Sequence, residues 1–131
     1  MSKITGIHHL ALSVSDLDRS IAWYGDVLGL SVDKRWQAEG MDKAKLSDAD
    51  GGLVVILVDH RAAARDGDFS ERRVGLDHVG LGVADRAALE EWRDRLDAKR
   101  IPHDGIKPGS TGDLIAFRDP DDLPLEFYTV G

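Results

Sequence analysis

Apolar and polar residues alternate along residues 7–14 and again along residues 76–83. Alternation with a period of two places the apolar side chains on one side of an extended chain. Turn-forming residues bound both segments, so the sequence predicts a β-strand in each.

A helix is predicted after each of these strands, because apolar residues then recur at intervals of three and four. These residues are Leu17, Ile21, Tyr24 and Leu28 in the first helix and Leu89, Trp92 and Leu96 in the second. Ser15, with Asp18 three residues later, predicts the start of the first helix, and Asp85 predicts the start of the second. Gly29 is a natural C-terminal cap, and Pro102 prevents the second helix from continuing.

Three further strands are predicted in each half of the chain. They cover residues 30–37, 42–48 and 53–59 in the first half and residues 103–107, 113–118 and 123–130 in the second. Clusters of Asp, Gly and Pro form turns before the last strand of each half. The predicted fold class is therefore α+β, with two tandem βαβββ modules.

The repeated element order matches an internal repeat in the sequence. Residues 6–16 and 75–85 agree at five of eleven positions, at a constant spacing of 69 residues (78 − 9). The matched pairs are Gly6 with Gly75, His9 with His78, Leu12 with Leu81, Val14 with Val83, and Asp16 with Asp85. Segments that begin at Asp48 and Asp119 also match, at a spacing of 71 (119 − 48).

The length of the chain suits one domain over residues 1–131. Within it we expect module 1 at about residues 1–59, a polar linker at residues 60–74 and module 2 at about residues 75–131. Hydrophobic residues make up 42% of the sequence and charged residues 31%, as in ordinary globular proteins.

Charge and composition exclude several classes of function. The chain has no cysteine, which excludes disulfides, thiolate metal sites and thiol catalysis. Its net charge of −7 argues against a nucleic-acid partner and against an anionic membrane surface. The longest apolar run is too short to span a membrane, and the N-terminus lacks the apolar core of a signal peptide. We therefore expect a cytoplasmic protein that acts on a small-molecule substrate.

Three side chains that lie far apart in the sequence carry the candidate chemistry. Strand alternation places His9 and His78 on the side away from the apolar residues, each beside small residues that leave space for a ligand. Glu126 lies among apolar neighbours in the last strand, on the same side as the histidines if the modules are equivalent. A metal would offset the cost of burying this carboxylate. Two imidazoles and one carboxylate leave coordination positions open, which indicates a catalytic metal centre.

The segments that carry these residues resemble a known superfamily. Residues 8–30 read H-H-L-A-L-S-V-S-D-L-D-R-S-I-A-W-Y-G-D-V-L-G-L, and two later segments read D-H-V-G-L-G-V and D-P-D-D-L-P-L-E-F. All three are similar to signatures of the vicinal oxygen chelate (VOC) superfamily, which is the glyoxalase / bleomycin resistance protein / dioxygenase family. The resemblance covers nearly the whole chain and implies a glyoxalase-like curved sheet around a metal cleft.

The resemblance also assigns the metal positions of the family to His9, His78 and Glu126. A fourth position falls on Val55, which can neither bind a metal nor move a proton. This departs from glyoxalase I and the related epimerases, which use carboxylates at both symmetric positions. The remaining three ligands resemble those of fosfomycin-resistance transferases and extradiol dioxygenases.

The leading hypothesis is a divalent-metal-dependent enzyme, either a glyoxalase-like lyase or isomerase or a dioxygenase. Two neighbouring oxygens of a small substrate would chelate the metal, which would act as a Lewis acid. Fe, Mn, Zn, Ni and Co are all compatible with the ligand set. Glu126 and Tyr128 are the candidate catalytic residues, because Tyr128 lies two residues beyond Glu126 on the same side of the strand.

Two other classes of function stay open. One is a bleomycin-resistance-type protein that sequesters a ligand without catalysis, which the apolar Val55 and Leu57 would suit. The other is a structural or regulatory domain with a vestigial site. Since two modules alone expose sheet edges and small relatives are commonly dimeric, the sequence also predicts a homodimer.

Overall fold

The computed structural model describes residues 1–130 of the chain. It divides into two compact units, Met1–Asp66 and Gly67–Gly131. Each unit contains one α-helix and a four-stranded mixed sheet in the order βαβββ. The predicted α+β class with two βαβββ modules is therefore confirmed.

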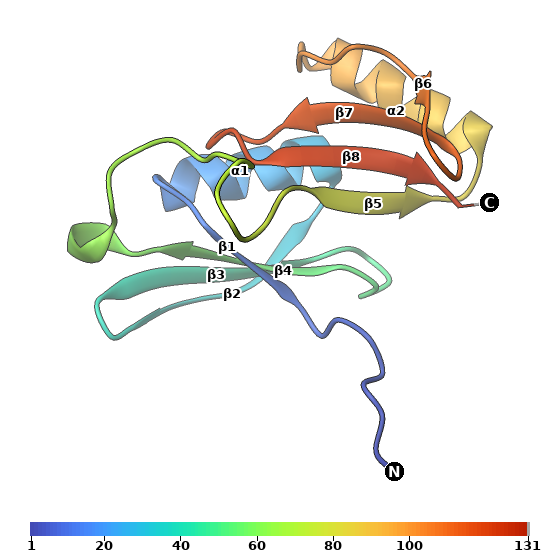
Figure 1. Cartoon of the computed structure of the whole chain (residues 1–131). Coiled ribbons are helices and arrows are strands. Elements are labelled where there is room, and N and C mark those ends of the chain that lie inside the picture. The colour runs from blue at the N-terminus through green and yellow to red at the C-terminus, as the bar shows by residue number, and fades with distance from the viewer. Residues whose placement is uncertain (131) are drawn as a thin grey trace. The chain divides into compact units, whose positions relative to one another are not determined.

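The first unit arranges its strands in the spatial order β1-β4-β3-β2, with β1 parallel to β4 (Figure 1). Its elements are β1 (Leu10–Ser13), α1 (Leu17–Leu28), β2 (Ser31–Ala38), β3 (Met41–Ser47), β4 (Val54–Asp59) and a short 3₁₀ helix, η1 (Arg61–Ala63). The first strand begins later than its alternating sequence predicts, so His9 lies directly before β1 rather than within it.

The second unit repeats this arrangement, with the spatial order β5-β8-β7-β6 and β5 parallel to β8. Its elements are β5 (Val79–Val83), α2 (Arg86–Ala98), β6 (Lys107–Pro108), β7 (Asp113–Arg118) and β8 (Pro124–Thr129). His78 lies directly before β5, in the same place as His9 before β1. The strand predicted at residues 103–107 is wrong except at its last residue, since β6 is confined to Lys107–Pro108 and Pro108 has no N–H to extend the ladder.

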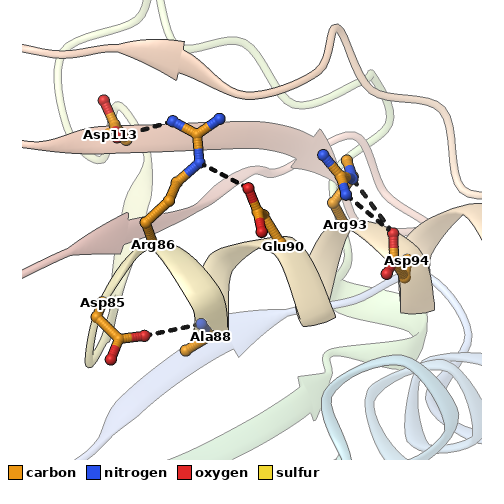
Figure 2. A network of polar contacts seen from close by, with 7 residues as sticks. All are labelled: Asp85, Arg86, Ala88, Glu90, Arg93, Asp94 and Asp113. Carbon is orange, nitrogen blue, oxygen red and sulfur yellow. Dashed lines mark hydrogen bonds and ion pairs between the residues drawn. The ribbon is translucent and has the colours of Figure 1, made fainter.

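Both helices begin at an aspartate that caps their free backbone N–H groups. The side chain of Asp16 accepts a hydrogen bond from the Arg19 N–H at 3.0 Å, so the predicted start at Ser15 is wrong by one residue. Asp85 accepts from the Ala88 N–H at 2.9 Å, as predicted (Figure 2). Gly29 ends α1 in the left-handed conformation, with φ of 75°, which glycine adopts without strain.

Each sheet buries one face under its own helix. In the first unit the side chains of Tyr24 and Val27 from α1 are buried, as are Leu46 and Leu57 of the sheet. In the second unit Leu89 and Leu96 from α2 are fully buried, together with Ile115 and Phe127 of the sheet. Trp92 stacks on Phe127 with ring centroids 4.4 Å apart, so this half-buried helical tryptophan packs against the core.

Arg86 joins α2 to the sheet from the helix surface (Figure 2). Its guanidinium donates to Glu90 on the next helical turn at 3.2 Å and to Asp113 on β7 at 3.1 Å. These groups are exposed, so the contact between α2 and β7 contributes little to stability.

The face of each sheet opposite its helix is called here the helix-free face. Residues paired across a ladder share a face, so the strand registers define its rows. In the second sheet the rows are Gly80, Glu126 and Ala116, then Gly82, Tyr128 and Leu114. In the first sheet they are Ala11, Ile56, Lys45 and Lys34, then Ser13, Val58, Lys43 and Trp36.

These registers correct the residue that is equivalent to Glu126. Glu126 pairs with Gly80, whose equivalent Ala11 pairs with Ile56, so the equivalent is Ile56 and not Val55. The spacing changes from 71 to 70 residues (126 − 56) because the turn after Asp48 is one residue longer than the turn after Asp119. Val55 is buried on the helix side of its sheet.

In residues 1–130, neither α1 nor α2 has the length and apolar character that a membrane-crossing helix requires.

Candidate functional site

His78 and Glu126 come together on the helix-free face of the second sheet. The Nε2 atom of His78 lies 3.4 Å from Oε1 of Glu126. The Glu126 side chain is 18% exposed, whereas that of His78 is 46% exposed. The structure therefore brings Glu126 together with His78, one of the two histidines that the sequence analysis placed on its side.

Small neighbours keep space open around the Glu126 carboxylate. Gly80 and Ala116 flank Glu126 in the ladder, so neither adjacent strand places a large side chain over it. A Cβ built on Gly80 would lie 3.7 Å from Oε1 of Glu126, which is an ordinary contact distance. A ligand atom can therefore reach the carboxylate from above the sheet.

Asp77 contacts the other ring nitrogen of His78, Nδ1. Its Oδ1 lies 2.7 Å from Nδ1 of His78. A carboxylate can only accept a hydrogen bond, so Nδ1 of His78 carries the proton of this contact. The hydrogen bond to Asp77 raises the pKa of His78, and the negative charge of Glu126 adds to this against the opposing effect of burial.

The tautomer that follows leaves two electron-pair donors facing each other. With the proton on Nδ1, the neutral His78 ring presents a lone pair at Nε2, and ionised Glu126 presents another at Oε1. Two acceptors at 3.4 Å repel unless a cation lies between them. That cation is either a second proton on the imidazole, consistent with its raised pKa, or a metal ion.

The separation of these two atoms fits a shared metal ion. An ion about 2.1 Å from each atom, with an angle of about 90° to 110° at the ion, separates them by about 3.0 to 3.4 Å. Imidazole nitrogen and carboxylate oxygen are both ordinary ligands of divalent transition metals. The His78–Glu126 pair therefore fits the implied metal in both distance and chemistry.

His9 is the equivalent of His78 in the first unit. Its Nδ1 lies 2.9 Å from Nδ1 of His8, so the preceding side chain engages Nδ1 in both modules. One of the two imidazoles donates in this contact and the other accepts. Its role as a third ligand stays a prediction based on the repeat. Across residues 1–130, no three His, Asp or Glu side chains gather into a group that could hold a metal ion.

Tyr128 lies two residues beyond Glu126 on β8, on the same face. Its phenol oxygen lies 3.5 Å from Ser110 Oγ and accepts a hydrogen bond from the Thr111 N–H at 3.1 Å. The Ser110 contact and then the Thr111 contacts lower the pKa of Tyr128. The loop can approach so closely because a side chain on Gly109 would collide with the phenol.

Asp77 is the one residue in contact with His78 at this candidate site that sequence reasoning missed. Its signal was an acidic residue directly before the second repeated histidine, where the first module has His8. The turn residue Asp119, by contrast, is structural, because its carboxylate accepts hydrogen bonds from the N–H groups of Asp121 and Leu123 at 2.9 Å.

Two surface hollows include neither His78 nor Glu126 among their lining residues. One lies at the β2–β3 turn, where Arg61 is paired with Asp42. The other lies on α2, where the guanidinium of Arg95 stands 5.6 Å from the centre of the Trp92 ring. Neither hollow is lined by a histidine. The candidate site is therefore identified by the polar contacts of His78 and not by a pocket.

Comparison with known proteins gives a consistent family match. The sequence profile of the Glyoxalase/Bleomycin resistance protein/Dioxygenase superfamily matches residues 6–127. The uncharacterised protein YwkD of Bacillus subtilis is 30% identical over 95% of this chain and 97% of its own length. The metallothiol transferase FosB of Staphylococcus epidermidis is 28% identical over 96% of this chain and 84% of its own. The putative ring-cleaving dioxygenase MhqA of B. subtilis is 25% identical over 89% of this chain, which spans only 38% of that protein.

Solved structures agree with this match. A glyoxylase/bleomycin resistance protein/dioxygenase domain from Frankia sp. EAN1pec has a TM-score of 0.89 and 29% identity, with 98% of this chain and 94% of that chain covered. A FosX fosfomycin resistance protein from Listeria monocytogenes, in complex with Mn(II) and a dihydroxypropylphosphonic acid, has a TM-score of 0.70 and 20% identity, with 96% and 90% covered. At that identity the FosX likeness concerns the fold alone.

Proposed function

Because the chain belongs to the Glyoxalase/Bleomycin resistance protein/Dioxygenase superfamily, we propose that it is a divalent-metal-dependent enzyme of the lyase/isomerase or dioxygenase type. Its substrate would be a small molecule with two neighbouring oxygens that chelate the metal. The observation that carries this proposal is the pair of electron-pair donors, His78 Nε2 and Glu126 Oε1, that face each other at 3.4 Å.

His78 and Glu126 would hold the metal, and His9 would be the third ligand through its equivalence to His78 in the repeat. Superfamily relatives support a divalent ion, since FosB is named a metallothiol transferase and the FosX structure contains Mn(II). When bound, the metal supplies Lewis-acid stabilisation of an oxyanion or enolate. Fe, Mn, Zn, Ni and Co all accept this ligand set.

The protein groups around the pair have separate tasks. Asp77 keeps the proton of His78 on Nδ1, so that Nε2 keeps its lone pair for a ligand. Glu126 supplies negative charge from a largely buried position, where water screens it less than at the surface. Tyr128 is the candidate proton donor to the substrate, because its hydrogen bonds to Ser110 and Thr111 lower its pKa.

A metal-binding measurement tests the first part of this proposal. The wild-type chain, Glu126→Ala and the control Glu90→Ala would be dialysed against Zn²⁺ or Mn²⁺ and their bound metal quantified. Glu90 is an exposed carboxylate on α2, so its loss should leave binding intact. We expect metal on the wild type and on Glu90→Ala but not on Glu126→Ala. Equal metal content in all three proteins would refute the site.

The reaction type is tested with the metal-loaded protein. Oxygen uptake with catechol on the Fe(II) form would indicate ring cleavage, and deuterium exchange from solvent into an α-hydroxy thioester would indicate an enolate-forming lyase or isomerase. Tyr128→Phe should lower the rate and remove the basic limb of the pH–rate profile, since only Tyr can lose the proton. An unchanged profile would exclude Tyr128 as the acid.

The second candidate is a ligand-sequestering protein without catalysis. Ile56, an apolar residue, occupies the position equivalent to Glu126, and Val58 lies beside it on the same face. Such a face suits an apolar ligand better than a second carboxylate would. Full ligand affinity in excess chelator, with no turnover of any metal form, would favour this candidate.

A further inference from the structure

Three lysines gather on the helix-free face of the first sheet. Lys34 pairs with Lys45 across the β2–β3 ladder, and Trp36 pairs with Lys43 in the next row. The ammonium of Lys34 lies 4.9 Å from the centre of the Trp36 ring. Alternation along β3 places Lys43 and Lys45 on one face, but the sequence does not place Lys34 opposite Lys45, because the β2–β3 register shifts between Val32 and Lys34.

No acidic side chain within residues 1–130 forms an ion pair with any of these three lysines. The nearby acidic groups are already engaged, since Asp42 pairs with Arg61 and Asp33 accepts from Ser47 at 2.7 Å. Like charges directly opposite each other on a sheet are destabilising. In a chain with a net charge of −7, an unneutralised cationic patch is a local exception that calls for an anionic partner.

Several arginines of the chain, in contrast, are paired with acidic groups. Arg118 is held by Glu71 at 3.1 Å and by the Asp122 carbonyl, and Arg35 is paired with Asp18 at 2.9 Å. The guanidinium of Arg86 contacts two carboxylates. The lysine patch therefore differs from them in chemistry as well as position.

We propose that Lys34, Lys43 and Lys45 bind the oxyanion group, a carboxylate or a phosphate, of a small-molecule substrate. This inference rests on the proposed function, for which it names the substrate class. The lysines of β3 share their sheet face with Ala11, Ile56 and Val58, which form an apolar floor between β3 and β1. Two strand spacings separate β3 from β1, about 10 Å. A substrate that lies across this floor places its charged group on the lysines and its body toward the β1 edge, next to His9.

The lysine stems suit this task. Lys43 and Lys45 are half-buried, so their methylene chains pack along the sheet while the ammonium groups reach the ligand. Trp36 pairs with Lys43 on the β2 side, away from β1, so its ring borders the charged group of the ligand rather than its body. Because β2 and β3 are joined by the two-residue turn Glu39-Gly40, their pairing fixes the spacing of the three charges.

The test uses the full chain in excess chelator, so that it does not depend on the metal. Binding of inorganic phosphate, benzoate and neutral benzyl alcohol would be followed by calorimetry and by Trp36 fluorescence, with Trp36→Phe to assign the signal. Lys43→Met and Lys45→Met keep the apolar stem and remove the charge. The control is Lys107→Met, an exposed lysine of the second unit.

We expect phosphate or benzoate to bind, with affinity reduced about tenfold by each of Lys43→Met and Lys45→Met and unchanged by Lys107→Met. Phosphate alone would assign a phosphate group, benzoate alone a carboxylate, and both the shared oxyanion chemistry. We also expect Lys45→Met to melt at a higher temperature than the wild type, because it relieves the repulsion with Lys34. No anion binding, or benzyl alcohol binding as well as benzoate, would overturn the proposal.

These experiments distinguish failure of the anion-binding proposal from failure of the metal-site proposal. Glu126→Ala should abolish metal binding and leave phosphate or benzoate binding unchanged, whereas Lys45→Met should weaken anion binding about tenfold and leave metal binding unchanged. If Glu126→Ala abolished metal binding while Lys45→Met left anion binding unchanged, the lysine patch would be refuted and the metal site retained.

Discussion

Removing the carboxylate of Asp77 should weaken metal binding without touching a metal ligand. Asp77→Ala deletes the acceptor that lies 2.7 Å from His78 Nδ1 and fixes the proton there. The imidazole can then place its proton on Nε2, where it would compete with the metal, and the ring loses its orientation. Partners of this kind typically change metal affinity by about 10- to 100-fold, or about 1.4 to 2.7 kcal/mol.

The structure places Asp77→Ala near the lower end of that range. The Asp77 side chain is 69% exposed, so water screens its charge and replaces part of its hydrogen bond. We therefore expect an affinity loss of about tenfold. Asp77→Asn should lose less, because its amide oxygen still accepts from Nδ1.

The assay is competition for Zn²⁺ between the protein and a chromophoric chelator at fixed pH. Asp97→Ala is a matched control, because Asp97 contacts His103 at 2.6 Å in the same unit without a facing carboxylate. Its Zn²⁺ affinity should equal that of the wild type. If Asp77→Ala also matched the wild type, or if Asp97→Ala lost as much, the assigned role of Asp77 would be wrong.

Further predictions concern stability and assembly. In the folded protein the pKa of His78 is raised above its unfolded value of 6.5. The protonated His78 side chain therefore contributes its full stabilisation below the unfolded pKa, and this contribution is lost as pH rises through the folded pKa. Urea unfolding of metal-free protein from about pH 5 to about pH 9 should show this decline, and His78→Gln should flatten it; an equal slope in both proteins would contradict it. Leu89→Ala should reduce the free energy of unfolding by about 2 to 5 kcal/mol, because Leu89 is fully buried. Glu91→Ala should change it little, because Glu91 is exposed. Equal midpoints of the two variants in denaturant would contradict this. The sequence-based prediction of a homodimer is tested by light scattering, where a monomer mass at all concentrations would reject it.

Much of the fold could be predicted because helices, strands and helix caps depend on residues that are close together in the sequence. Apolar spacing located both helices, and the alternating residues of β7 located that strand at its observed limits, Asp113–Arg118. Asp85 and Gly29 cap their helices as predicted, since capping depends on nearby backbone groups alone. The repeat located His9 and His78 at equivalent positions.

The features that sequence could not supply depend on register. The turn after Asp48 has one extra residue, so the equivalent of Glu126 is Ile56 and not Val55. The spacing between Asp48 and Asp119 does not include this extra residue and therefore pointed to Val55. Both residues are apolar, so the conclusion that the first module lacks the second carboxylate holds. The contact between Asp77 and His78 depends on the rotamers of adjacent side chains, which no periodicity encodes.

The account depends most on a single cation shared by His78 and Glu126, and ¹⁵N NMR of the imidazole rings observes it directly. At a pH where His78 is neutral, the metal-free protein should show its proton on Nδ1. Added Zn²⁺ should shift the Nε2 resonance of His78 and leave Nδ1 protonated in the wild type, and the Nε2 shift should vanish in Glu126→Ala. A proton on Nε2 in the metal-free protein, or a His78 spectrum that Zn²⁺ leaves unchanged, would contradict the account.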